Sequence, residues 1–372
     1  MIQPTVRGVD FPALAVCLAM SFSAPAAATG EFEDAGRSDE RSDNAKATEI
    51  VTKMASAGDA AGQFRLGMLF VKGHGVRQNY PQAVNWFRKA AAQGHAEAQN
   101  SLGVRYEKGQ GVAKDYRQAA AWYRKAAMQG FGLAQDNLSD LYVKGLGVAK
   151  DDVNAYLWSS LASINGELVS ARKRARLEPG MTAERLAEAH YRLGAAYATG
   201  QGVSRDNQGA VQWLTKAATQ GHVLAQYQLA ESHDRGIGVA QDYKQAAAWF
   251  EKAATNGHAR AQSAIGYMYD IGQGVAADSQ RARDWYEKAA VQGDVVAQYN
   301  LGSMYGNGRG VDQSDLHAHT WFGIAEAHSD KTATAAAESR KLVETRMTRE
   351  QIAEGRRLAR EWMKLHSREN VD

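Results

Sequence analysis

The stretch GHAEAQNSLGVRYEKGQGVAKDYRQAAAWYRKAAMQG, residues 94–130, decides the fold of this 372-residue chain. Three apolar residues four positions apart mark one face of a first helix: Ala98, Leu102 and Tyr106. Gly109 can take the left-handed conformation that ends a helix, and Asp115 can cap the start of a second one. The second helix has an apolar face of its own: Ala119, Trp122, Tyr123 and Ala126. The stretch therefore predicts a pair of antiparallel helices that Gly130 closes.

This unit recurs seven times, at steps of 36 residues with a single longer step of 55 between the third and fourth copies. Seven tryptophans mark the copies: Trp86, Trp122, Trp158, Trp213, Trp249, Trp285 and Trp321. The capping position is filled each time by a residue suited to it: Asn79, Asp115, Asp151, Asp206, Asp242, Asp278 and Ser314. A fixed period in the thirties is typical of a solenoid, in which neighbouring repeats stack to bury their apolar faces. We therefore expect an all-α solenoid of helix–turn–helix repeats.

The tryptophans are expected to form its core. A glycine in the first helix of five repeats would let the second helix, with its tryptophan, approach closely: Gly67, Gly103, Gly194, Gly266 and Gly302. The Gly-x-Gly pairs, such as Gly109 and Gly111, link two helices and do not follow a strand, which argues against a phosphate-binding loop.

Composition agrees with a folded, soluble chain, with 44% hydrophobic and 23% charged residues. A formal charge of +3 over this length is close to neutral, so no nucleic-acid partner is expected, since that role needs a concentrated basic face.

The first 28 residues are expected to be a signal peptide. Residues 11–22 form a short uncharged apolar run, and a small-residue stretch ending at Ala28 follows as a cleavage site. Arg7 is the only basic side chain before that run, which leaves open a start that carries no signal. Cys17, the only cysteine, would be removed, so the mature chain would have no disulfide and no cysteine ligand. Periplasmic or secreted location without membrane insertion is the expectation, with residues 29–44 as a flexible leader.

The pattern A-x-A-x-x-x-L-G-x-x-Y-x-x-G-x-G-V-x-x-D-Y-x-x-A-x-x-W-Y-x-K-A-A-x-x-G in residues 96–130 resembles the Sel-one-like repeat (SLR) family, a relative of the tetratricopeptide repeat. The resemblance covers roughly residues 58–372. It implies a right-handed superhelix with a concave groove lined by the first helix of each repeat. It also implies adaptor or scaffold roles, including regulation of envelope signalling and polysaccharide secretion.

Two arrays of repeats are predicted, residues 45–186 and 187–372. The segment that starts Met181-Thr182-Ala183-Glu184 is similar to one that starts Met347-Thr348-Arg349-Glu350, and each follows the last repeat of its group. Terminal repeats need a polar capping helix, so we expect one cap used twice, with the first copy continuing directly into the fourth repeat. Residues 43–56 are expected to form a half-repeat cap at the start.

No metal, cofactor or catalytic site is expected. His95, His222 and His258 occupy equivalent positions in different repeats, about 8–10 Å apart if the helices pack normally, which is too far to share one zinc ion. A hydrolase is the third and least favoured hypothesis.

The favoured hypothesis is a non-catalytic, monomeric scaffold that binds a segment of a partner protein in its groove. Candidate groove cations vary between repeats: Arg65, Lys72, Arg105, Lys108, Lys144, Arg192 and Arg235. Lys72, Lys108 and Lys144 would form a basic ladder for an acidic partner, although lysines there also complement a helix dipole. The alternative is an envelope carbohydrate or peptidoglycan binder that uses Tyr227, Tyr267 and Tyr299.

Overall fold

A computed structural model of the chain describes residues 40–328 and 331–366. The predicted signal peptide and most of the predicted leader lie outside these residues. Within them the chain forms eighteen α-helices, one 3₁₀ turn and no strand. The elements are α2 (Glu40–Ser56), α3 (Ala60–Lys72), α4 (Tyr80–Ala92), α5 (Ala96–Lys108), α6 (Tyr116–Ala127), α7 (Gly132–Lys144), α8 (Asp152–Ile164), α9 (Leu168–Leu177), η1 (Glu178–Gly180), α10 (Ala183–Thr199), α11 (Asn207–Thr219), α12 (Val223–Arg235), α13 (Tyr243–Thr255), α14 (Ala259–Ile271), α15 (Ser279–Val291), α16 (Val295–Asn307), α17 (Asp315–Glu326), α18 (Lys331–Glu344) and α19 (Arg349–His366).

Seven helix pairs form the predicted repeats and stack as an α-solenoid. In order they are α3/α4, α5/α6, α7/α8, α10/α11, α12/α13, α14/α15 and α16/α17, and we call the two members of each pair helix A and helix B. Every predicted cap of a helix B is confirmed, since its side chain accepts a hydrogen bond from a backbone N–H of the first turn. Asp115, for example, accepts from Arg117 N at 2.8 Å and from Gln118 N at 3.1 Å.

In six of the seven repeats the apolar side chain that fills the core is the one after the tryptophan, which corrects the sequence-based expectation. Phe87, Tyr123 and Tyr286 have no measurable exposure, whereas the seven tryptophans are only half-buried. A Cβ added at Gly103 would lie 2.6 Å from the Tyr123 ring, so the helix A glycine makes room for this residue and not for the tryptophan.

Each tryptophan instead lies over the joint with the preceding repeat, as Trp122 does on the first repeat. The ring faces that joint on one side and a lysine on the other. In five repeats the ammonium of the lysine three positions on lies 3.9–4.2 Å from the ring centroid: Lys89, Lys125, Lys216, Lys252 and Lys288.

A buried amide ladder joins the repeats. The fourth residue of helix A is a buried glutamine in six repeats: Gln63, Gln99, Gln135, Gln226, Gln262 and Gln298. Its Nε2 donates to a carbonyl near the end of the preceding helix, as Gln262 does to Ala254 O at 3.0 Å. In all of them but Gln298, Oε1 accepts from an amide that follows helix B of its own repeat, as in the 2.7 Å bond from Gln292 Nε2 to Gln262 Oε1. Buried polar groups need such partners, so the ladder fixes the register of one repeat on the next.

The solenoid ends differ from its interior. At the start, α2 occupies the place of a helix B, with Val51 and Ala55 packed against Leu66. It begins at Glu40, inside the segment predicted as leader. At the other end, α18 and α19 cover α17, and Trp362 of α19 meets Trp321 edge to face at 5.4 Å.

The direction of helix A relative to the preceding helix B changes between the third and fourth repeats. Elsewhere the two helices are antiparallel, as α5 and α4 show. Gly111, in the loop after α5, lies so close to Tyr80 at the start of α4 that an added Cβ would collide with the Tyr80 backbone. At the junction, α9 and η1 carry the chain back so that Arg185 at the start of α10 pairs with Asp152 at the start of α8. Gly202, in the loop after α10, accepts from Asn165 Nδ2 just past the end of α8 at 2.8 Å. Helix α10 therefore runs parallel to α8.

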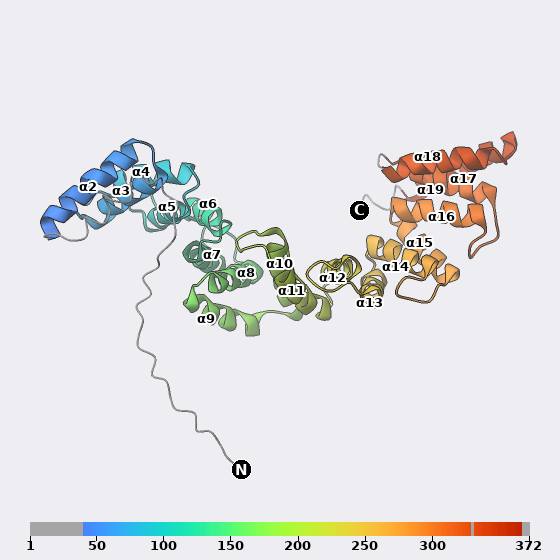
Figure 1. The fold of residues 1–372 in the computed structure, drawn as a ribbon, viewed down its shortest axis with the longest axis horizontal. Helices are drawn as coiled ribbons and strands as arrows, with labels where there is room; N and C mark the ends of the chain where they lie inside the picture. Colours follow the sequence, from blue (N-terminus) through green and yellow to red (C-terminus); the bar gives the residue numbers. More distant parts are fainter. Residues whose placement is uncertain (1–39, 329–330, 367–372) are drawn as a thin grey trace, which may run out of the picture.

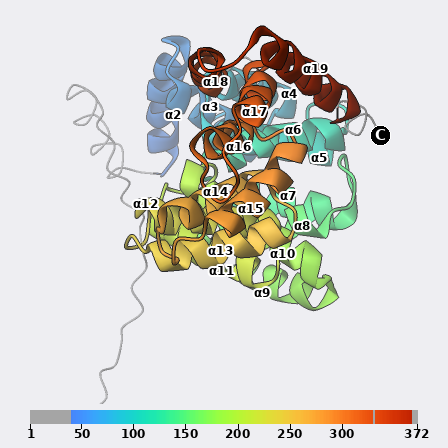
Figure 2. The ribbon, with the colours of Figure 1, turned by 90° about the vertical axis from the view of Figure 1, so that its right-hand side faces the viewer.

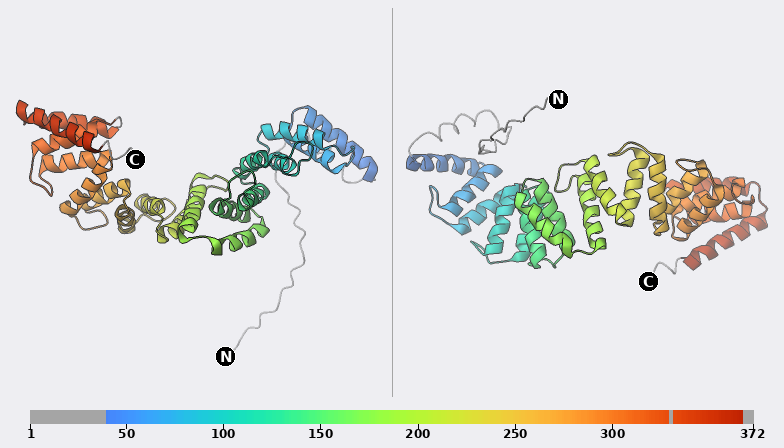
Figure 3. Two further views of the ribbon diagram at one scale, coloured as in Figure 1. Left: turned by 180° about the vertical axis from the view of Figure 1, so that it is seen from behind. Right: turned by 90° about the horizontal axis from the view of Figure 1, so that it is seen from below.

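The result is an elongated, curved array with its two ends far apart along the long axis (Figure 1). Both Figure 1 and the view at right angles to it (Figure 2) place α2 and α18 on the same side of the arc, with the junction helix α9 at its opposite edge. Seen from below (Figure 3, right), the helices follow one another from α2 to α19 along the array.

Candidate functional site

Two adjoining pockets lie on the helix A side of the second array. The larger one, about 670 Å³, lies between α12, α14 and α16, and the smaller one, about 320 Å³, between α12 and α14. Tyr227, Ala264 and Tyr267 line both of them. We call this continuous depression the array-two groove. Two of the three tyrosines predicted from sequence are thus brought together by neighbouring helices.

Tyr227 is a fixed wall of the groove. Its ring stacks on the His258 ring at 4.4 Å and 25°, and its hydroxyl donates to Glu231 Oε1 at 3.1 Å. Burial and the neighbouring Glu231 raise the pKa of Tyr227 to about 12, so the phenol keeps its proton. His258 caps α14 by accepting from Ala261 N at 3.1 Å, and burial lowers its pKa, which favours the neutral ring that the cap requires.

Tyr267 is the most exposed aromatic side chain of the groove. It is 49% exposed although it lines both pockets. Beside it, Ala264 is the smallest side chain at its position in helix A; the other six repeats carry Arg65, Ser101, Asn137, Arg192, Gln228 and Asn300 there. The side chain at this position of helix A is therefore smallest in α14, where Ala264 lines both pockets.

Charges of both signs flank Tyr267. Arg260 and Asp294 line the larger pocket, and Asp294 also caps α16 by accepting from Ala297 N at 2.9 Å. Glu231, Asp234 and Arg235 line the smaller pocket, where Arg235 lies 3.4 Å from Glu231. Neither Arg260 nor Asp294 was predicted from sequence. For Arg260 the signal was present, because its position in the other repeats holds no cation: Ala61, Glu97, Leu133, Glu188, Leu224 and Val296.

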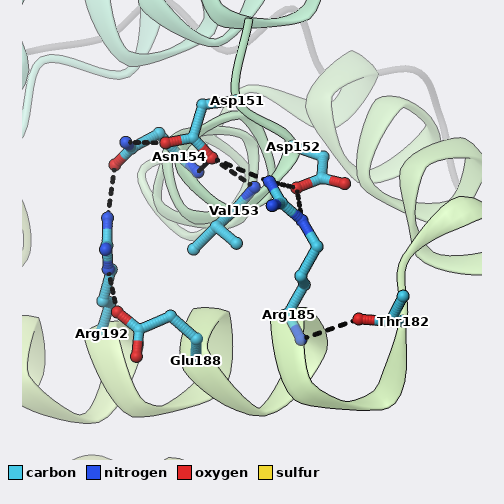
Figure 4. Close-up of polar contacts among 8 residues, drawn as sticks. All are labelled: Asp151, Asp152, Val153, Asn154, Thr182, Arg185, Glu188 and Arg192. Carbon is cyan, nitrogen blue, oxygen red and sulfur yellow. Dashed lines mark hydrogen bonds and ion pairs between the residues drawn. The ribbon is translucent and has the colours of Figure 1, made fainter.

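A separate pocket of about 730 Å³ lies at the junction of the two arrays, and Arg192 is part of it. Arg192 does not face a free groove. Its Nε donates to Glu188 Oε1 at 2.6 Å and its Nη1 to Asn154 Oδ1 at 3.1 Å. Figure 4 shows Arg185, Glu188 and Arg192 of α10 directed at the start of α8, where Arg185 also binds Asp151 and Asp152. This pocket is held by internal ion pairs that join the arrays.

The remaining predicted residues lie outside the array-two groove. Arg105 is partly buried with its guanidinium 5.3 Å from the Tyr80 ring centroid, and burial lowers its pKa. Lys144 lies 3.9 Å from Asp140. Tyr299 packs against Phe322 at 5.5 Å instead of lining either groove pocket. Arg65, Lys72 and Lys108 are exposed and line none of the three pockets described above. The basic ladder of Lys72, Lys108 and Lys144 stays a prediction.

No cluster of three potential metal ligands occurs in residues 40–328 and 331–366. Within the same residues, no helix combines the length and apolar character needed to cross a membrane. His95 and His222 cap helices α5 and α12, by accepting from Ala98 N and Ala225 N.

Comparison with known proteins agrees with the helix pairs. The Sel1 repeat family matches seven segments: residues 60–95, 96–131, 132–167, 187–222, 223–258, 259–294 and 295–330. Each match begins at the first residue of a helix A and ends just after the partner helix B, apart from the fourth, which begins inside α10. A search of curated protein sequences gave no match.

Similar solved structures are themselves Sel1-repeat proteins. One is a protective antigen of uropathogenic Escherichia coli with an SLR fold, 27% identical over 87% of this chain and 95% of that one, at a TM-score of 0.35. Another is a Sel1 repeat protein from Oxalobacter formigenes, 29% identical over 83% and 84% of the two chains, at a TM-score of 0.40. With seven matched repeats over more than half of its length, this chain belongs to the Sel1-repeat family.

Proposed function

We propose that this protein is a non-catalytic scaffold that binds an extended segment of a partner protein in the array-two groove. Sel1-repeat proteins generally serve as protein–protein interaction scaffolds, and most are non-catalytic. The observation that carries the proposal is the pair of adjoining pockets that share Tyr227, Ala264 and Tyr267.

The groove has the features of a site for a polypeptide. Tyrosine is among the residues that contribute most to protein interfaces, because a large rigid ring loses little entropy on binding. Tyr267 offers such a ring, and the adjacent Val296 is 47% exposed at the edge of the larger pocket. Tyr227 is already held by His258 and Glu231, so this wall needs no rearrangement on binding.

The test is site-specific crosslinking in the organism that carries the chain. Benzoylphenylalanine in place of Tyr267 should give a crosslinked adduct with one partner protein, which mass spectrometry identifies. The control places the same group at Gln212, an exposed residue of α11 that lines none of the described pockets. Equal adducts at both positions, or none at Tyr267, would refute the proposed function.

An envelope glycan is the second candidate occupant. The exposed Tyr267 ring is the observation that favours it, since sugar rings stack on aromatic faces and the groove also holds polar groups. A glycan array probed with the protein and with Tyr267→Ala separates the two. Glycan binding that depends on Tyr267, without a protein adduct, would favour this candidate.

We further propose an envelope location, supported by the apolar run at residues 11–22 and the small residues up to Ala28. Expression in a bacterial host should yield a mature chain that begins at Thr29. Intact-mass measurement of the purified protein decides this, and a chain that retains residues 1–28 contradicts it.

A further inference from the structure

An aspartate in the smaller pocket lacks the cation that its counterpart has. In the sixth repeat, Asp270 near the end of α14 accepts two hydrogen bonds from Arg309 Nη1, at 3.0 and 2.9 Å, and Arg309 comes from the loop of the following repeat. One repeat earlier, the equivalent residues are Asp234 and Gln273, and both line the smaller pocket. Glutamine carries no charge, so Asp234 faces the groove without the cross-repeat ion pair.

The larger pocket contains a cation, Arg260, that lacks the ion pairs of the equivalent residue in another repeat. The residue equivalent to Arg260 in the fourth repeat is Glu188, which pairs with Arg192 four positions on and with His222 of the next repeat. For Arg260, the residue four positions on is Ala264, so the first of these pairs is missing. The residue equivalent to His222 is Asp294, whose carboxylate caps α16, and no ion pair within 4.0 Å joins it to Arg260 in the part of the chain that is described.

These two charges are separated by a distance that an extended peptide spans in a few residues. Arg260 is the second residue of α14 and Asp234 the twelfth of α12, an offset of about 15 Å along the helices. Neighbouring helices pack about 10 Å apart, so the diagonal over Ala264 and Tyr267 is about 18 Å. An extended chain advances about 3.3 Å per residue, and side-chain reach shortens the path, so the diagonal corresponds to about four to six residues.

We infer that the array-two groove selects a segment with an acidic residue at Arg260, an apolar residue against Tyr267, and a basic residue at Asp234. This inference rests on the proposed function and names the chemistry of the partner segment. Opposite charges at the two ends of the groove fix the direction in which the segment binds. They also reject segments whose charges all have one sign, because one end would then meet a like charge.

The experiment uses fluorescein-labelled nine-residue peptides and the whole chain, with binding followed by fluorescence anisotropy. Glu and Lys are placed five positions apart with Leu between them, in both orders, on a Gly/Ser background. Peptides with two Glu, with two Lys, or with Ser in place of Leu are the controls. One of the two mixed-charge orders should bind at least tenfold more tightly than the other order and than every control.

Variants at the two ends test the assignment directly. Arg260→Glu combined with Asp234→Lys should reverse the preference for peptide order. Asp294→Asn keeps a good capping residue and removes the competing carboxylate, so it should tighten binding of the preferred peptide severalfold. Circular dichroism confirms that each variant remains folded.

The outcomes separate this inference from the proposed function. Binding that requires Tyr267 but is indifferent to peptide charge, or to the double charge reversal, overturns the inference and leaves the scaffold function standing. Absence of binding by every peptide, with a partner adduct at Tyr267, also overturns the inference alone. Absence of both overturns the two proposals together.

Discussion

Replacing Gln262 by alanine should weaken the joint between the fifth and sixth repeats by about 2.5 kcal/mol. The side chain is 5% exposed and makes two hydrogen bonds, to Ala254 O and from Gln292 Nε2. Each bond contributes about 1 kcal/mol net. Alanine keeps Cβ, so one buried methylene is lost, which costs about 0.8 kcal/mol, and the better helix propensity of alanine returns a few tenths.

The chain contains its own control for this estimate. Gln298 is equally buried and donates to Ala290 O at 3.1 Å, but its Oε1 has no hydrogen-bond partner among the described residues. Gln298→Ala should therefore cost about 1.5 kcal/mol, one hydrogen bond less than Gln262→Ala. Gln292→Ala removes the shared bond and a longer, exposed bond from Gln292 Nε2 to Lys288 O at 3.4 Å, and should cost about 1 kcal/mol. The double variant Gln262→Ala/Gln292→Ala should be less than additive by the contribution of the shared bond, about 1 kcal/mol.

Urea unfolding followed at 222 nm gives the overall change in the free energy of unfolding. Because a long repeat array need not unfold in one step, native-state hydrogen exchange of α13 and α14 should localise it to this joint. The reasoning is refuted if Gln262→Ala and Gln298→Ala cost the same. It is also refuted if the two substitutions of the Gln262–Gln292 pair are additive.

Three further predictions concern the core, the junction and pH. Tyr286→Ala should destabilise the chain by about 3–5 kcal/mol, and Trp285→Ala by distinctly less, since only the first ring is fully buried; urea midpoints in the opposite order would contradict this. Arg185→Ala should change the free energy of unfolding by less than about 1 kcal/mol, as its ion pairs are largely exposed, yet broaden the distance distribution between spin labels on the two arrays; an unchanged distribution would contradict a role in holding the junction. Burial lowers the pKa of His190 below 6.5, so the unfolded chain binds more protons there and stability is lost as the pH falls below about 6.5. His190→Gln should reduce the drop in melting temperature between about pH 7.5 and 5.5, and an equal drop in both proteins would exclude His190 as its source.

His190 shows how the junction differs from the regular repeats. It stands where six other repeats have glutamine, donates from Nδ1 to Gln220 Oε1 at 2.9 Å, and contacts the Tyr156 hydroxyl at 3.3 Å. In the regular repeats the glutamine donates to the carbonyl eight residues before it. The inserted α9 and η1 have displaced that carbonyl at the junction. The sequence shows the substitution, but only the packing of α10 on α8 explains it.

The repeat itself was predictable in detail. The caps, the glycines at helix ends and the helix pairs follow from contacts between residues close in sequence, where local backbone preferences decide the conformation. The buried glutamines were equally visible as a 36-residue period and were missed, because a polar residue is not expected in a core unless its partners are known. The expectation that the tryptophans form the core was wrong for a related reason, although Tyr123 is predicted on the same apolar face as Trp122. Adjacent residues on a helix differ by only 100° in direction, and periodicity alone does not say which one faces the partner helix.

By itself, the sequence determined an all-α array of seven repeats and the residues that begin and end their helices. The tertiary structure alone decided that α10 runs parallel to the preceding helix B, and that the open groove lies over α14. A repeat sequence specifies how each unit folds and stacks on its neighbour, because those contacts recur at every step. The groove depends on residues that break the repeat, such as Ala264, Arg260 and Gln273, and their effect appears only when successive helices are placed side by side.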